Sequence, residues 1–189
     1  AELENAYKSL KENETSLAEA QRMAHIGNWD WDIVTGEVYW SNEVYRIFGR
    51  TPQEPGATYD ELFNYVHPED QGYLINVINK GLNGKPHGID YRIVRANGEE
   101  RTVHAQSEVI FDDKKIPIRA KGISQDITER KKAEEMLKES EGKLKALFNL
   151  LPVGVSITDE ERNILDANLS LERILDLSRL DLLKGKYGG

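Results

Sequence analysis

The sequence has no cysteine, so no disulfide, thiolate metal site or cysteine nucleophile can form within its 189 residues. It also has no apolar run approaching the roughly 20 residues that a membrane-spanning helix needs. The chain opens with AELENAYKSL, which is too charged to be the apolar part of a signal peptide. These absences predict a soluble segment in a reducing compartment, and we expect a cytoplasmic location without membrane contact.

The sequence has fewer basic than acidic residues. The 33 Asp and Glu residues outnumber the 25 Lys and Arg residues, which gives a formal net charge of −8. A nucleic-acid surface needs a clustered basic face, so we expect no nucleic-acid partner.

Groups that would support catalysis or hold a metal ion are also missing. The four histidines, His25, His67, His87 and His104, have no histidine or carboxylate at the spacing of metal ligands. The sequence has neither a nucleophile paired with a base nor a glycine-rich phosphate loop. We therefore predict no metal site and no enzymatic activity for this segment, and we assign His67 a structural role at the start of a helix.

Two parts of the chain are similar to each other. An offset of 127 positions places Gly27–Asp32 on Gly154–Asp159 and Arg46–Phe48 on Arg173–Leu175 without a gap. The charged segments that precede these stretches align at the same offset, although few residues are identical. We interpret this pattern as a repeat in which a helix precedes the same globular opening.

Apolar residues in both charged segments recur at alternating spacings of three and four, which are the a and d positions of a heptad. One polar position in each segment lies in the same stripe, and such a residue fixes the register of a coiled coil at some cost in stability. We predict that residues 1–24 and 128–151 are helices that form a parallel homodimer; the alternative is that each packs as an amphipathic helix on its own domain. The predicted dimer seam comprises Leu10, Asn13, Leu17, Ala20, Leu137, Ser140, Leu144 and Leu147.

Between these helices the hydrophobic pattern changes to the period of two that is typical of strands. Trp29 and Trp31 alternate with polar residues, and Asn97-Gly98 marks a hairpin turn between two later strands. Short helices are predicted between the second and third strands, the first of them with Ser41 as its N-cap. This order of elements predicts one α+β domain over residues 25–127, with five antiparallel strands and helices on one face.

Four stretches of this region resemble, in order and spacing, the signatures of a PAS domain with its C-terminal PAC part. They are GNWDWDIVTGEVYWSNEVYRIFG, YVHPED, YRIVRANGEERTVHAQ and GISQDITERKKAE, and the first is similar to the tryptophan-rich first strand of one PAS subclass. The resemblance runs from Ala24 to about Lys132. It implies a sheet in the order 2-1-5-4-3 and a sensory role in a larger signalling protein, most often a sensor histidine kinase.

A later stretch, residues 145–183, resembles the opening third of another PAS domain. It ends before the third, fourth and fifth strands, so its first strand would be left with an open edge, which proteins normally avoid. We therefore predict that residues 152–189 are the truncated start of a second domain. We expect them to lack an independent core, and to be either loosely packed or paired with another copy of the chain.

The PAS resemblance also bears on cofactors. Haem-binding members place their ligand histidine on the helix that corresponds to residues 69–85, and that stretch has none. Flavin photoreceptors of this fold use a reactive cysteine, which this chain lacks. We expect no haem, exclude cysteinyl-flavin photochemistry, and leave the identity of any other cofactor open.

PAS domains that bind ligands hold them between the sheet and its helices, where this chain has either a small-molecule pocket or a core filled by aromatic side chains. Strand alternation does not decide whether Asn28, Arg92, His104 or Gln106 adds a polar group there. The candidates to line the pocket are Trp29, Trp31, Tyr91, Ile93, Val103 and Ala105 on the strands, and Ile47, Phe48 and Leu74 on the helices.

The last predicted strand joins the exit helix without a glycine or proline between them. Asp126 and Glu129 have the spacing of a capping box, which places the helix start near Ile127 and Thr128. We predict that these four residues form a signal joint, through which a shift in the sheet moves a two-state helical linker. Two alternatives remain: a ligand-free dimerisation scaffold, or the sensor region of a cyclase or a transcription regulator.

Overall fold

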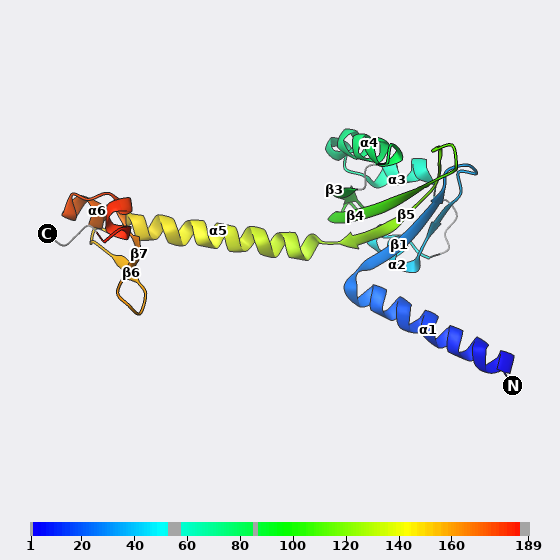
Figure 1. The fold of residues 1–189 in the computed structure, drawn as a ribbon, viewed down its shortest axis with the longest axis horizontal. Coiled ribbons are helices and arrows are strands. Elements are labelled where there is room, and N and C mark those ends of the chain that lie inside the picture. The colour runs from blue at the N-terminus through cyan, green and yellow to red at the C-terminus, as the bar shows by residue number, and fades with distance from the viewer. Residues whose placement is uncertain (1, 53–57, 85–86, 186–189) are drawn as a thin grey trace. The chain divides into compact units, whose positions relative to one another are not determined.

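The chain divides into two compact units, Ala1–Lys131 and Lys132–Gly189 (Figure 1). The predicted helix 1–24 and the predicted tail 152–189 include residue 1 and residues 186–189, which lie outside the described part of the chain. The structure is a computed structural model, and it describes residues 2–52, 58–84 and 87–185.

Five antiparallel strands form the sheet of the first unit in the order β2-β1-β5-β4-β3. This arrangement confirms the predicted α+β fold and the strand order that the resemblance implied. Because successive side chains of a strand point to opposite faces, one face of the sheet can be apolar while the other meets water. The strands are β1 (Ile26–Asp32), β2 (Val38–Trp40), β3 (His87–Val94), β4 (Glu100–Phe111) and β5 (Pro117–Asp126).

Between β2 and β3, the described residues form three helices, which pack on the inward face of the sheet. Val44, Leu74 and Val77 of these helices share one buried cluster with Ile89 and Tyr91 of β3. The predicted helix over 69–85 is the last of the three, and Lys85 lies outside the described residues. The helices are α2 (Asn42–Ile47), α3 (Tyr59–Tyr65) and α4 (Pro68–Leu82).

The helix starts that the sequence predicts are held in different ways. Ser41 occupies the N-cap position of α2, but its hydroxyl does not cap that helix. It accepts a hydrogen bond from the backbone N–H of Asn28 at 3.1 Å instead, and so ties α2 to β1. His67 does cap α4, because its Nδ1 accepts a hydrogen bond from the N–H of Glu69 at 3.3 Å.

Asp70 in the first turn of α4 anchors that helix to β3. Its carboxylate accepts hydrogen bonds from the backbone N–H of Arg92 at 2.7 Å and from the Arg92 guanidinium at 2.6 Å. These hydrogen bonds from Arg92 hold the pKa of Asp70 below its usual value, against the smaller opposing effect of burial. The ionised form of Asp70 is therefore the one that the fold stabilises.

We predict that Asp70→Asn lowers the free energy of unfolding at neutral pH by about 1–2 kcal/mol, because a charge-assisted but partly solvated interaction is weakened. A carboxyl group with a lowered folded-state pKa stabilises the fold above its unfolded pKa of about 3.9, and that contribution is lost as the pH falls through the folded pKa. Urea unfolding of the wild type should therefore lose more stability on acidification than that of Asp70→Asn. Parallel pH profiles for the two proteins would contradict the prediction; Glu69→Gln, at a more exposed partner of Arg92, is the control.

Long helices flank the sheet of the first unit. α1 (Glu2–Ala24) and α5 (Thr128–Leu150) each have 23 residues, which is about 35 Å of helix at 1.5 Å per residue. Ile26 pairs with Gln125, so α1 ends and α5 begins close together, at the same end of two neighbouring strands. No helix among the described residues is both long enough and apolar enough to span a lipid bilayer.

The second unit contains most of α5, a two-stranded sheet and two short helices among its described residues. Ala167, Asn168 and Leu182 are buried in it. After α5, its elements are β6 (Ser156–Thr158), β7 (Ile164–Ala167), α6 (Leu169–Leu175) and α7 (Arg179–Leu183). Most of its large apolar side chains are exposed, namely Val153, Ile157, Leu165, Leu169, Ile174, Leu175, Leu180 and Leu183.

Hydrogen bonds in the second unit reproduce those of the first at the same offset in sequence. In the first unit, the N–H of Asn28 donates to the Ser41 hydroxyl, and the N–H of Ser41 donates to the Asn28 carbonyl. In the second unit, the N–H of Val155 donates to Oδ1 of Asn168, and the N–H of Asn168 donates to the Val155 carbonyl. The same link between a strand and the start of a helix therefore occurs twice.

A glycine also makes the same close approach in both units. A Cβ atom on Gly27 would lie 2.4 Å from Cγ2 of Val44, and one on Gly154 would lie 2.8 Å from Cδ1 of Leu171. At Gly27 the backbone nitrogen of Val44 would also lie 2.6 Å away, so a larger residue would push the strand from the helix; at Gly154 the nearest backbone atom, the Leu171 Cα, is 3.2 Å away, so the fit is close but less strict. These matching contacts support the interpretation that the chain contains a repeat.

We predict that trypsin cuts the second unit before the first. Arg162 and Arg173 are exposed in a unit with few buried residues, and such a region opens at little cost in free energy. Limited proteolysis at low protein concentration, followed by intact-mass measurement, would give the order of cleavage. A second unit that survives as long as the five-stranded sheet would overturn the prediction. Protection that develops only at high concentration would indicate pairing with another copy of the chain.

Candidate functional site

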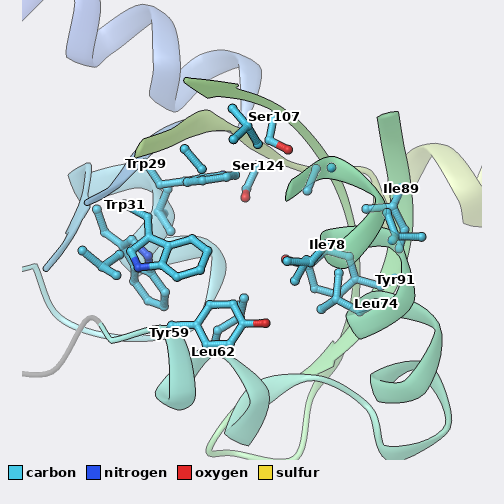
Figure 2. A pocket seen from close by; sticks show the side chains of 18 of the residues that line it. Trp29, Trp31, Tyr59, Leu62, Leu74, Ile78, Ile89, Tyr91, Ser107 and Ser124 are labelled. Carbon is cyan, nitrogen blue, oxygen red and sulfur yellow. The ribbon is translucent and has the colours of Figure 1, made fainter. Parts of the chain in front are cut away.

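A cavity of about 110 Å³ lies in the first unit, between the inward face of the sheet and the connecting helices. Figure 2 shows Trp31 and Tyr59 on one side of it and Ile78 and Tyr91 on the other. The space between sheet and helices is therefore neither a fully packed core nor a large open pocket.

The cavity exists because small side chains stand on two neighbouring strands in the middle of the sheet. Ala105 and Ser107 of β4 and Ala120 and Ser124 of β5 line it. Protein interiors are otherwise close-packed, so small residues between bulky walls leave space. The strands on either side carry large residues that line the same cavity, namely Trp29 and Trp31 on β1 and Ile89 and Tyr91 on β3.

Gly122 of β5 allows the Trp29 indole to lie close to this strand. A Cβ atom at this position would lie 2.7 Å from Cζ2 of Trp29 and 2.2 Å from the carbonyl oxygen of Gln106. Both distances are shorter than real contacts, so a larger residue would displace the indole and disturb the pairing of β4 with β5. Gly122 therefore sets the position of one aromatic wall.

Tyr59 closes one side of the cavity by stacking on Trp31. Their ring centroids lie 4.6 Å apart with an angle of 18° between the planes, and Phe63 meets Tyr59 edge-on at 5.2 Å. Burial raises the pKa of Tyr59, and the charge of Asp60 adds to this effect. The phenol is therefore neutral, and in Figure 2 its hydroxyl points across the cavity toward Tyr91.

Ser124 and Tyr91 give the cavity a polar end. Both are buried. Burial raises the pKa of the Tyr91 phenol far above its usual value, and the Ser124 side chain has a smaller, opposite effect on that pKa. The Ser107 hydroxyl lies near Ser124 in Figure 2. Hydroxyl groups both donate and accept hydrogen bonds, so this end suits a polar but uncharged group.

The sequence-based candidates for the pocket separate into two groups. Ile47, Ile93 and Val103 are buried in the packed core but do not line the cavity. The alternation of side chains along the strands correctly identifies the inward face of the sheet. Ile93 lies on this face, but Val66 pairs with it through an isolated β-bridge and covers it, so it does not reach the cavity. The candidates that do line the cavity are Trp29, Trp31, Phe48, Leu74, Tyr91 and Ala105.

Sequence reasoning missed the polar lining. Ser107 and Ser124 stand on the inward face in the same alternation as Ala105 and Ala120, so extending the count along β4 and β5 would have found them. Tyr59 lies at the start of a short helix, and no pattern in the sequence places it against Trp31.

The sequence did not decide whether four polar residues point into the pocket, and none of them lines the cavity. Asn28 accepts a hydrogen bond from Gln21 of α1 at 2.8 Å, Arg92 is engaged by the α4 carboxylates, and His104 binds Asp90. Gln106 stands between two lining residues of β4 but does not face the cavity. Within the described part of the chain, no three histidine or carboxylate side chains are grouped to hold a metal ion.

The joint between β5 and α5 is a single residue, Ile127, which is buried. Its N–H donates to the carbonyl of Thr102 on β4 at 2.9 Å. The Thr128 hydroxyl accepts a hydrogen bond from the N–H of Thr102 at 2.9 Å. The first turn of α5 is therefore bonded to β4 as well as continuous with β5.

Asp126 caps this helix, but the predicted capping box is incomplete. Its carboxylate accepts hydrogen bonds from the N–H of Thr128 at 2.9 Å and from the Thr128 hydroxyl at 2.5 Å. The N–H of Asp126, which the Glu129 side chain would take in a capping box, donates to the carbonyl of His25 at 3.1 Å instead. The capping box is incomplete because the end of α1 lies beside the end of β5, where the His25 carbonyl takes the N–H of Asp126. The spacing of residues along the sequence does not predict this contact.

Charged groups extend this attachment to β3. Nζ of Lys131 on α5 lies 2.9 Å from Asp90 of β3, and Nδ1 of His104 on β4 lies 2.6 Å from the same carboxylate. Burial opposes ionisation of Asp90, but the hydrogen bonds from His104 and Lys131 hold its pKa below the usual value. Arg101 of β4 lies 3.5 Å from Asp126 at the joint itself. The start of α5 thus contacts three adjacent strands.

The predicted seam residues all lie on the surface of α1 and α5. Leu10, Leu17, Leu137, Leu144 and Leu147 are each more than half exposed. The remaining seam residues, Asn13, Ala20 and Ser140, are exposed too.

Comparison with known families gives two matches. A family model described as "PAS fold" matches residues 37–124, and one described as "PAS domain" matches residues 142–188. Among curated proteins, the chain is similar to the blue-light-activated histidine kinase of Brucella ovis, with 34% identity over 138 residues that cover 70% of this chain and 27% of that protein. The chain thus spans about a quarter of the length of the curated relatives that it matches.

Two solved structures illustrate the similarity in fold. A sensory box histidine kinase/response regulator from Burkholderia thailandensis has a TM-score of 0.58 and 25% identity, and the match covers 69% of this chain and 98% of that one. The N-terminal domain of a diguanylate cyclase with a PAS/PAC sensor from Marinobacter aquaeolei has a TM-score of 0.51 and 21% identity, with 56% and 97% coverage. The second likeness concerns the fold alone.

Proposed function

Because this chain belongs to the PAS family, we propose that its first unit is the sensory module of a cytoplasmic histidine protein kinase. In this proposal the unit carries no enzymatic activity of its own. It detects a small molecule or a partner and relays the change from the sheet to the helix α5. Catalysis then belongs to a part of the protein outside these residues.

One observation carries the proposal, which is that a single strand both lines the cavity and leads into the exit helix. Ala120 and Ser124 of β5 line the cavity, and only Ile127 separates the end of the same strand at Asp126 from the start of α5. The N–H of Ile127 donates to the Thr102 carbonyl, and the N–H of Thr102 donates to the Thr128 hydroxyl, so the helix start is held to β4. A displacement of the cavity wall would therefore tilt or rotate α5.

The kinase output is proposed from the named relatives. The Brucella protein is a histidine kinase, and so is the Burkholderia protein whose structure is similar. The diguanylate cyclase shares the fold at 21% identity, and a shared fold alone does not define an output. A cyclase or a transcription regulator therefore stands as the alternative output.

The light response in the Brucella protein's name does not transfer directly. Flavin photochemistry by a cysteinyl adduct needs a thiol, and the chain has no cysteine. The cavity of about 110 Å³ is also well below the 300–1,000 Å³ of pockets that hold drug-sized ligands. We propose a smaller signal for this chain.

Relay through the joint is tested by inserting two glycines between Asp126 and Ile127. Glycine removes the rigid connection between β5 and α5, so the insertion should abolish regulation of the full-length protein's autophosphorylation while leaving the domain folded. The amide NMR spectrum of the chain checks folding, and a phosphorylation assay with and without the stimulus checks regulation.

A matched control inserts the same two glycines between Asp113 and Lys114, in the turn joining β4 to β5. These residues are exposed and lie at the other end of both strands, so the control should retain regulation. Regulation that survives the insertion after Asp126 would refute the relay.

We also propose that α1 and α5 associate with the same helices of a second copy. Both helices have an exposed leucine stripe at heptad spacing, and burying such a stripe drives coiled-coil formation. About three heptads per helix make only a marginal coiled coil. The dimer is therefore expected to depend on protein concentration and to respond to small changes at the joint.

The double substitution Leu137→Lys and Leu144→Lys should convert the dimer to a monomer, because it places like charges within the seam. Light scattering coupled to size-exclusion chromatography, over a range of concentrations, measures the change. Glu135→Lys with Ala146→Lys is the control, since it adds lysines to α5 at exposed positions outside the seam. A wild-type chain that is monomeric at every concentration would count against the seam.

A ligand-free scaffold is the rival to a sensor. The small size of the cavity, about 110 Å³, favours it because little room is left for a ligand. A scaffold would retain the dimer, release no small molecule in native mass spectrometry, and tolerate the insertion after Asp126. A sensor would fail the last of these tests.

A further inference from the structure

We infer that the cavity takes a small, uncharged molecule built on a single ring, with one hydroxyl or carbonyl group placed at Ser107 and Ser124. This inference rests on the proposed sensory function and names the class of signal for that site. It follows from the size, charge, shape and polarity of the lining.

The volume of the cavity limits the size of the ligand. The cavity has a volume of about 110 Å³, whereas an engineered apolar cavity of about 150 Å³ in another protein holds benzene. A single-ring molecule therefore needs only small movements of the walls. Two fused rings, or a cofactor such as flavin, would require the wall formed by Trp31 and Tyr59 to separate from Ile78 and Tyr91.

The lack of charged side chains in the lining restricts the class of ligand further. Among the described residues that line the cavity there is no Asp, Glu, Lys, Arg or His. Burying an ionised group without a partner costs much more free energy than burying a polar one that is hydrogen-bonded. The two phenols in the lining, Tyr59 and Tyr91, are held neutral by burial, which raises the pKa of each. Carboxylates and ammonium ions are thus excluded.

Shape favours a planar molecule. Trp31 and Tyr59 are stacked with nearly parallel rings, and Trp29 lies along β5 above Gly122. Figure 2 shows the aliphatic side chains of Leu74 and Ile78 on the opposite side. A flat ring between these walls makes stacked or edge-to-face contacts with the aromatics and apolar contacts with the aliphatic residues.

Polarity orients the molecule. The hydroxyls of Ser107 and Ser124 lie at one end of the cavity in Figure 2, away from Leu62 and Tyr59. Both serine side chains line the cavity, and a hydroxyl can both donate and accept a hydrogen bond. A ligand hydroxyl or carbonyl at Ser124 would contact β5 three residues before Ile127. Of the β5 residues that line the cavity, Ser124 is the one closest in sequence to α5.

The test compares phenol, benzene and benzoate as probes of the intact chain at neutral pH. The chain has three tryptophans, and Trp29, Trp31 and Trp40 all line the cavity. Their indole N–H resonances therefore report on this site. We expect phenol to shift these resonances saturably, benzene to bind more weakly, and benzoate to leave them unchanged.

Variants assign the effect to the cavity and to its polar end. Ser107→Ala should weaken the binding of phenol by about three- to tenfold, which corresponds to the loss of one hydrogen bond. The affinity for benzene should not change. Ala105→Leu fills the cavity and should abolish binding of both, and Ala105→Val serves if the larger residue prevents folding. Gln106→Leu is the matched control, because it adds a similar side chain on the opposite face of β4, and it should bind like the wild type.

The outcomes separate the two levels of the proposal. Saturable binding of benzoate at the cavity would overturn the ligand class while leaving a small-molecule sensor in place. Binding of none of the probes, with no molecule released from the native protein in mass spectrometry, would overturn the ligand class and the ligand-sensing role together. Phenol binding that Ala105→Leu does not affect would place the probe outside the cavity and would also overturn the inference.

Discussion

The first unit depends on the pairing of β5 with a neighbour on each side. β1 and β4 flank this strand, so its residues have partners on both sides. Ser124, for example, is opposite Gly27 of β1 and Ala105 of β4. A strand hydrogen-bonded along both edges moves only together with its neighbours. The inward side chains of β5 line the cavity, and its last residue caps α5. Ligand contact and helix direction are thus properties of one constrained segment.

The same pairing brings the two flanking helices together. Gln125 donates a hydrogen bond from Nε2 to the carbonyl of Ala24 at 3.2 Å, and Asp126 donates one to His25. The end of α1 is therefore bonded to the strand from which α5 emerges. A movement of either helix would therefore act on the same end of β1 and β5.

The second unit shows which part of the fold is local. The link between Val155 and Asn168 and the close approach at Gly154 repeat those of the first unit, because they involve residues close in sequence. The unit has no counterpart of β3, β4 and β5 among its described residues, and in the first unit these strands supply much of the inward face. Leu165 and Ile174 remain exposed for that reason, since a strand-and-helix pair cannot bury its apolar face by itself.

Sequence alone determined the elements and their faces in this protein. Alternation at Trp29 and Trp31, the turn at Asn97-Gly98 and the heptad leucines are local patterns, and the structure has the strands, the hairpin and the helices that they predict. The strand order was available only because the motifs resemble a known family. Local patterns also identified Asp126 as the residue that caps α5, because a cap acts within a few residues.

Tertiary structure alone decided where the cavity lies and what holds the joint. Ile93 and Ser107 stand on the same face of neighbouring strands, yet only Ser107 lines the cavity, because the helices cover one end of the sheet more tightly than the other. Tyr59 reaches Trp31 from a distant helix, and His25 takes the N–H that Glu129 was predicted to cap. These contacts join residues far apart in sequence, and the positions of packed helices and strands, which no local pattern encodes, determine them.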